Sequence, residues 1–156
     1  MTVVDRIRSE SFTDFVTEAE PRLRQALTGS LGPELGREAA AEALAYGWEH
    51  WDRVKPMENS VGYLFRVGQR WGRRARSRTR PVFPSVEPSR LPWVEPGLPE
   101  ALRGLSARQR TVVFLRFGHE WSLGEIAELL GVSKASVQSY SDRAMERLRG
   151  RLGAER

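Results

Sequence analysis

The clearest alternation of apolar and polar positions lies in the last third of the chain. Two consecutive segments place their packing residues at helical spacing, the first at Leu123, Ile126, Ala127 and Leu130 and the second at Val137, Ser141, Ala144 and Leu148. Ser122 followed three positions later by Glu125 is the pattern of a capping box at a helix start. Gly131 stands between the segments, where a chain leaving a helix often needs a left-handed residue, and Ser133 can cap the second helix. This spacing predicts a helix-turn-helix.

The outward positions near the start of the second helix are polar or small, and they comprise Lys134, Ala135, Ser136, Gln138 and Ser139. In a helix-turn-helix this part of the second helix enters the major groove of DNA, where amides and hydroxyls bond base edges. An ordinary helical hairpin with a solvated polar face would show the same pattern. We favour nucleic-acid binding because the whole pattern supports it.

Helical patterns also fill the first part of the chain. We expect a short helix before Pro21 and a second helix that begins at Pro21, because proline suits the first turn of a helix. That second helix should end at Thr28-Gly29. An alanine-rich, helix-favouring segment follows from residue 34 to about residue 51.

Two further helices are predicted nearer the middle of the chain. Asn59 or Ser60 can cap the first of them, whose inward residues are Val61, Leu64, Phe65, Val67 and Trp71. Ser106 and Gln109 form another capping box. The helix that follows should pack under the helix-turn-helix through Val112, Val113, Leu115 and Phe117.

Prolines mark the boundary between two helical parts. Residues 81–99 hold six of the nine prolines in the chain. Proline is excluded from helix interiors and favours an extended chain, so this segment is predicted to be a linker. The sequence therefore predicts an all-α fold of two small helical domains, residues 1–80 and 98–156, joined by a Pro-rich linker over residues 81–97. The C-terminal domain would carry the helix-turn-helix.

Charge is distributed unevenly along these 156 residues, whose net charge is +5. Residues 1–60 carry 7 basic and 11 acidic side chains, whereas residues 61–80 carry 7 arginines and no acid. Residues 101–156 carry 10 basic and 6 acidic side chains. An acidic first segment suits a protein partner, and the basic segments suit phosphate.

The arginine-rich segment also contains the aromatic residues Tyr63, Phe65 and Trp71. Arginine binds phosphate, and aromatic faces can stack on unpaired bases. The alternative is a solvated helix end whose aromatic residues belong to the core. We favour nucleic-acid contact for the arginines and core packing for each aromatic residue.

Several classes of chemistry find no support in the sequence. With no cysteine there can be no disulfide and no thiolate ligand, and His50 and His119 lack the spacing of metal ligands. There is no phosphate-cradling glycine loop and no His/Ser/Asp cluster, so we expect no enzyme activity, no cofactor and no metal.

No apolar run approaches the roughly 20 residues of a membrane span, and the N-terminus lacks a signal-peptide core. We therefore expect a cytoplasmic protein.

Residues 11 to 152 resemble an extracytoplasmic-function (ECF) sigma factor, a small member of the sigma-70 family. LRGLSARQRTVVFLRFGHEWSLGEIAELLGVSKASVQSYSDRAMERLR is similar to region four of that family, and this is the more specific match. FTDFVTEAEPRLRQAL, EALAYGWEHWDRV and NSVGYLFRVGQRWGRRARSR are similar to region two, the last of them to actinobacterial-type members.

The resemblance implies transcription initiation, with core RNA polymerase and promoter DNA as partners and an anti-sigma factor as a further candidate partner. Region two would bind polymerase and help to open the proximal promoter element, and region four would read the distal element. The implied polymerase-binding residues are Glu38, Glu42, Leu44 and Trp48. The implied DNA-binding residues are Lys134, Ser136, Gln138, Ser139, Tyr140 and Arg143 in the recognition helix and Arg66, Gln69, Arg70, Arg73 and Arg74 in the arginine segment, with Arg76 and Arg147 as further phosphate contacts.

Two other functions remain open on the sequence. One is a stand-alone helix-turn-helix regulator that binds duplex DNA without polymerase. The other is an interaction module that an anti-sigma factor sequesters or that acts as a decoy. Binding to core polymerase through residues 34–51 would separate a sigma factor from the stand-alone regulator.

Overall fold

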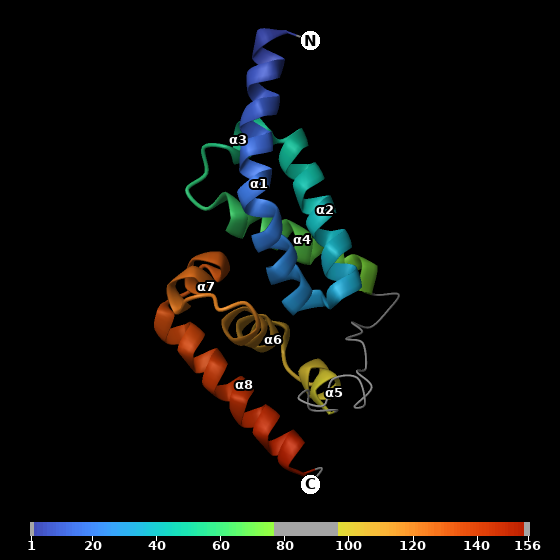
Figure 1. Cartoon of the computed structure of the whole chain (residues 1–156), viewed down its shortest axis with the longest axis vertical. Helices are drawn as coiled ribbons and strands as arrows, with labels where there is room; N and C mark the ends of the chain where they lie inside the picture. Colours follow the sequence, from blue (N-terminus) through green and yellow to red (C-terminus); the bar gives the residue numbers. More distant parts are fainter. Residues whose placement is uncertain (1, 77–96, 155–156) are drawn as a thin grey trace.

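The computed structural model describes residues 2–76 and 97–154, and every regular element in these two ranges is a helix, which confirms the predicted all-α class (Figure 1). All of the predicted Pro-rich linker except Gly97 lies outside the described residues. In chain order the elements are α1 (Val3–Leu31), α2 (Pro33–Glu49), α3 (Trp51–Val54), α4 (Ser60–Arg76), α5 (Leu98–Arg103), α6 (Ala107–Val113), the π-helical turn η1 (Phe114–Gly118), α7 (Leu123–Leu130) and α8 (Lys134–Ala154).

Helix α1 is one continuous helix of 29 residues, so the predicted break at Pro21 and the predicted end at Thr28-Gly29 are wrong. A proline inside a helix removes one hydrogen bond and costs about 3 kcal/mol. Tertiary packing offsets this cost, because Ala19 and Leu23, on either side of the proline, are both buried. The helix ends at Leu31, and Gly32 follows with a positive φ of 92°.

Helices α1, α2 and α4 form the N-terminal unit, by which we mean residues 2–76. Helices α1 and α2 lie side by side, and α4 crosses them (Figure 1). Gly36 permits the close crossing of α1 and α2, since a Cβ atom at this position would lie 2.6 Å from the Cα of Thr28. Asn59 caps α4 by accepting a hydrogen bond from the backbone N–H of Gly62, as predicted. Of the predicted inward residues of α4, Leu64 and Phe65 are buried and Val61, Val67 and Trp71 are half-buried.

Helices α5 to α8 form the C-terminal unit, residues 97–154. Both capping boxes predicted here are present, Ser106 with Gln109 at α6 and Ser122 with Glu125 at α7. Gly131 has φ +67° and ends α7 in the left-handed conformation, as expected. The predicted packing face of the second helix is confirmed, because Val137, Ser141, Ala144 and Leu148 are all buried.

The segment before the helix-turn-helix differs from the prediction at one residue. Val112, Val113 and Leu115 are buried as expected, but the side chain of Phe117 is 56% exposed. The chain changes from α-helix to the wider π-helical turn η1 at Phe114, and this shift of register turns Phe117 away from the core.

The two units share one hydrophobic core. Leu23 and Leu27 of α1 belong to the same buried cluster as Val112, Leu115 and Ile126 of the C-terminal unit. A second, smaller cluster lies entirely within the C-terminal unit, where Ala101 and Leu105 pack against Ala144 and Leu148. Helix α6 lies directly against α1 (Figure 1).

Candidate nucleic-acid and polymerase interfaces

The first turns of α8 present polar groups on the side opposite its buried face. Ser133 caps this helix, since its Oγ accepts a hydrogen bond from the backbone N–H of Ser136 at 3.0 Å. Lys134 and Ala135 are exposed, and Ser136, Gln138, Ser139 and Tyr140 are partly exposed. Val137 points the other way and is fully buried, which fixes the rotation of the helix. This is the arrangement that a recognition helix requires.

Two arginines outside α8 hold the polar groups of this surface. Arg116 donates hydrogen bonds to Gln138 Oε1 at 3.4 Å and to Ser141 Oγ at 3.0 Å. The Gln138 amide nitrogen in turn donates to Asp142 Oδ1 at 2.8 Å. Both ends of the Gln138 amide are therefore engaged, and these hydrogen bonds fix the orientation of the side chain.

Arg108 holds Tyr140 in the same way. It donates a hydrogen bond to the Tyr140 hydroxyl at 2.9 Å, and its guanidinium lies 5.7 Å from the centre of the ring. Sequence reasoning missed Arg108 and Arg116, because they precede the helix-turn-helix and only the packing of α6 and η1 beside α8 brings them to this surface. Farther along α8, Arg143 is exposed and Arg147 donates to Gln109 Oε1 at 3.0 Å.

Helix α4 carries the described part of the arginine-rich segment, residues 61–76, and most of the predicted DNA-binding residues in it are exposed. Arg66, Arg70, Arg73 and Arg74 are exposed. Arg66, Arg70 and Arg73 line a cleft of about 200 Å³, and Arg108 and Leu130 of the C-terminal unit line it from the other side. The structure thus brings arginines from both units to one place.

Gln69 and Arg76 are used differently from the other predicted residues of α4. Gln69 donates a hydrogen bond to the hydroxyl of Ser30, and Arg76 donates to the carbonyl oxygen of Ser30 at 3.1 Å. Burial lowers the pKa of Arg76, and the charge of nearby Arg73 lowers it further. These two side chains hold α4 against the end of α1.

Aromatic and arginine side chains meet in a second pocket, of about 320 Å³, between α2 and α4. Tyr46, Tyr63 and Trp71 line it together with Arg66, Arg70 and Arg74. The two tyrosine hydroxyls lie 3.1 Å apart; this hydrogen bond raises the pKa of Tyr46 and lowers that of Tyr63. Tyr63 and Trp71 are half-buried against the core, and Phe65 is fully buried, so core packing is their main role.

The outer face of α2 carries the residues assigned to polymerase binding. Glu38 and Glu42 are one turn apart and exposed, while Ala39, Ala40 and Ala43 on the inner face are buried. Trp48 is 38% exposed near the end of the helix. Arg8 of α1 stacks 4.4 Å from its ring centre and donates a hydrogen bond to its carbonyl oxygen.

Leu44 is half-buried and packs against the core, so less of it is accessible than of the two glutamates.

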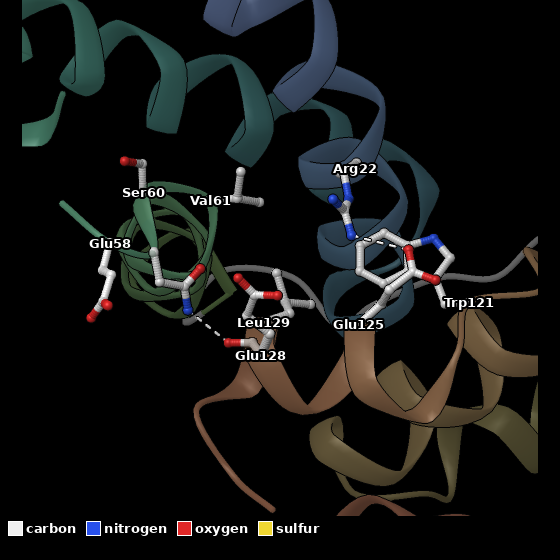
Figure 2. Close-up of a pocket in the computed structure, with 9 residues that line it drawn as sticks. Arg22, Glu58, Ser60, Val61, Trp121, Glu125, Glu128 and Leu129 are labelled. Atoms are coloured by element: carbon white, nitrogen blue, oxygen red, sulfur yellow. Dashed lines mark hydrogen bonds and ion pairs between the residues drawn. The ribbon is translucent and has the colours of Figure 1, made fainter. Parts of the chain in front are cut away.

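A further pocket, of about 230 Å³, lies where the loop before α4 and helix α1 meet α7. Figure 2 shows Arg22 reaching Glu125, with which it forms an ion pair at 3.2 Å, and Trp121 beside them. Hydrogen bonding from Ser122, and then the charge of Arg22, lower the pKa of Glu125. Within the described ranges no cluster of His, Asp and Glu side chains is placed to hold a metal ion, and no helix there has the length and apolarity to cross a membrane.

The fold and these surfaces define a two-part helical protein with a helix-turn-helix. Residues 101–150 match the family described as Sigma-70, region 4. Over 153 residues the chain is 28% identical to the RNA polymerase sigma-E factor of Streptomyces coelicolor, covering 92% of this chain and 86% of that protein. The fold also matches the sigma factor RpoE of Bartonella quintana, solved in complex with the anti-sigma factor NepR, with a TM-score of 0.61 and 21% identity over 93% of this chain and 98% of that one.

Residues 101–150 therefore carry a sigma-70 region 4, and the sequence relative supports an RNA polymerase sigma factor of the ECF type. The resemblance seen in the sequence is thereby confirmed.

Proposed function

We propose that this chain binds core RNA polymerase through the outer face of α2 and directs it to promoters that α8 and α4 contact. The observation that carries the proposal is the exposed start of α8, where Lys134, Ser136 and Gln138 stand outward from a helix anchored by buried Val137. Such a helix can enter a major groove and contact base edges.

The second DNA surface would be the exposed arginines of α4. Arg66, Arg70, Arg73 and Arg74 form a concentration of positive charge suited to phosphate. Because guanidinium groups bind phosphate without reading sequence, we assign this surface to binding strength and to promoter opening, and we assign promoter choice to α8.

The polymerase surface would be the acidic and aromatic face of α2. Glu38 and Glu42 offer negative charge, and the exposed edge of Trp48 offers the kind of aromatic anchor that dominates protein interfaces. Glu42→Arg and Trp48→Ala should each remove core polymerase from a pull-down. Glu18→Arg reverses a charge that is also exposed, but on α1, and is the matched control.

Run-off transcription separates this function from its alternatives. A sigma factor adds promoter-specific transcripts to core enzyme, and Glu42→Arg abolishes them. A stand-alone regulator would bind duplex DNA without binding core enzyme, and a decoy would bind core enzyme without yielding a transcript. We place the protein in the cytoplasm, where polymerase acts, and we propose a protein of the anti-sigma class as a further partner by analogy with the Bartonella quintana complex.

A further inference from the structure

We propose that the arginine face of α4 binds a free nucleoside triphosphate, with the base in the aromatic pocket between α2 and α4 and the phosphates in the adjoining cleft toward the C-terminal unit. The site itself can be tested without DNA or polymerase. Its consequence for promoter binding rests on the proposed function, since it concerns the same arginines.

Two pockets adjoin along Arg66 and Arg70. These side chains line both the cleft of about 200 Å³ toward the C-terminal unit and the pocket of about 320 Å³ toward α2. They lie one helical turn apart, and both are exposed. Together the two volumes fall within the roughly 300–1,000 Å³ that small-molecule sites occupy. One small ligand can therefore reach both pockets across these two guanidinium groups.

The cleft concentrates positive charge that no acidic side chain offsets. Its lining includes four arginines, Arg66, Arg70 and Arg73 of α4 and Arg108 of α6, and none of its described lining residues is acidic. Within residues 2–76 and 97–154 the three arginines of α4 form no ion pair. Guanidinium groups bind phosphate through paired N–H donors, and several of them around one space favour an anion there. The cleft therefore suits a polyphosphate.

The far wall of the cleft belongs to the C-terminal unit and presents one oriented cation. Arg108 donates a hydrogen bond to the Tyr140 hydroxyl at 2.9 Å, and its guanidinium lies 5.7 Å from the centre of that ring. A guanidinium has five N–H donors, so this contact orients the side chain and leaves donors for a phosphate. A bound polyphosphate would thus be held from both sides of the cleft.

The second pocket offers aromatic surface of the kind that binds a base. Tyr46, Tyr63 and Trp71 line it, and each is half-buried, with one side packed against the core. The Tyr46 ring stacks on His50 with ring centres 4.1 Å apart. Its hydroxyl accepts a hydrogen bond from Arg53 at 2.6 Å and lies 3.1 Å from the Tyr63 hydroxyl. These contacts fix the orientation of an aromatic wall on which a base can stack.

The combination of the two pockets defines the ligand. Inorganic phosphate would use only the cleft, and a nucleoside would use only the aromatic pocket. A nucleoside triphosphate carries both groups on one molecule, joined by a sugar that can cross Arg66 and Arg70. Because it would neutralise arginines assigned to promoter phosphate, nucleotide and promoter DNA should compete for α4.

Isothermal titration calorimetry of the full chain tests the site, with ATP as the probe. We expect one ATP per chain and a dissociation constant at least tenfold lower than those of inorganic tripolyphosphate and adenosine. Equal affinity for ATP and tripolyphosphate would mean that the arginines bind any polyanion, and that result or absence of ATP binding would overturn the proposal. Calorimetry involves neither DNA nor polymerase, so its result is independent of the proposed function.

Two substitutions test the two pockets. Arg70→Gln removes a guanidinium that lines both and should weaken ATP binding at least tenfold. Trp71→Leu should weaken ATP binding at least fivefold but keep the affinity for tripolyphosphate within twofold, which also shows that the variant is folded.

Arg37→Gln is the matched control, because it makes the same change of charge at an exposed position of α2 outside both pockets. It should bind ATP within twofold of the parent. Equal losses in Arg70→Gln and Arg37→Gln, or a folded Trp71→Leu protein that binds ATP as tightly as its parent, would contradict the inference.

Competition with DNA tests the consequence. ATP at about ten times its dissociation constant should raise by at least threefold the concentration of chain that half-saturates a labelled promoter duplex. Fluorescence anisotropy would measure this without polymerase, because polymerase itself binds nucleotides. An unchanged DNA affinity would refute the competition. If the chain binds no promoter duplex even without ATP, the assignment of α4 to DNA fails instead, and calorimetry still decides the nucleotide site.

Discussion

Replacing Arg110 by methionine should destabilise the folded chain strongly, because its guanidinium caps a helix to which it does not belong. The last four carbonyl groups of any helix lack intrahelical partners and carry partial negative charge. Helix α1 has no basic residue in its own last turn. Arg110 supplies the missing donors at Gly29 and Ser30, and Arg76 adds a second hydrogen bond at Ser30.

The magnitude follows from what the substitution would leave behind. The Gly29 carbonyl would lose its donor, and the Ser30 carbonyl would keep only the donor from Arg76. The longer bonds from Arg110 to the carbonyls of Leu102 and Leu105, at 3.4 and 3.3 Å, would also be lost. A buried acceptor without a donor costs about 1–3 kcal/mol.

Burial of the charge works in the opposite direction. It lowers the pKa of Arg110 to about 10, and the neutral methionine avoids that desolvation cost. We therefore expect a net loss of about 3 kcal/mol in the free energy of unfolding, and about half of that for Arg110→Lys, which keeps one cation at the helix end.

Urea unfolding followed by circular dichroism would measure this loss. For a chain of this size the melting temperature should fall by about 6–12 °C. Arg108→Met is the matched control, because Arg108 lies on the same helix but is exposed, and it should cost less than about 0.5 kcal/mol. Equal stability of the two variants would refute the capping argument.

Three further predictions address the DNA surfaces, the turn and the effect of pH. Gln138→Ala should change promoter preference by about 1–3 kcal/mol per lost base contact. Arg73→Ala should instead weaken binding to all promoters alike and reduce by about one the slope of the logarithm of the binding constant against the logarithm of the salt concentration. Fluorescence anisotropy at several salt concentrations would measure both effects. Gly131→Val should cost at least about 1–2 kcal/mol in urea unfolding, because valine is strained at φ +67°; an unchanged midpoint would contradict a left-handed turn here. The pKa of Glu125 is lower in the folded protein than in the unfolded chain. The ionised Glu125 carboxylate therefore stabilises the fold above its unfolded-state pKa, and this stabilisation is lost as the pH falls through its folded-state pKa. The urea midpoints of unfolding at pH 7 and pH 3 should therefore differ less in Glu125→Gln than in the parent.

Local chemistry in the sequence determined much of the C-terminal unit. The capping boxes at Ser106 and Ser122 involve residues three positions apart, and the left-handed Gly131 follows from the helix end that precedes it. The buried face that contains Val137 follows from helical spacing alone. Such features depend on neighbours along the chain, so the pattern of residue types was enough to predict them.

Tertiary packing decided the features that the sequence did not reveal. Helix α1 continues through Pro21 because it is buried on both sides of that residue, and neither this burial nor the turn of Phe117 toward solvent can be read from local propensity. Arg110 caps the C-terminal end of α1 by donating a hydrogen bond to the carbonyl oxygen of Ser30, which lies 80 positions earlier in the chain. Gly29 resembles a helix stop in the sequence, yet in the structure it is the point where another helix approaches. In each case the deciding partner lies far along the chain, and only the folded structure brings the two together.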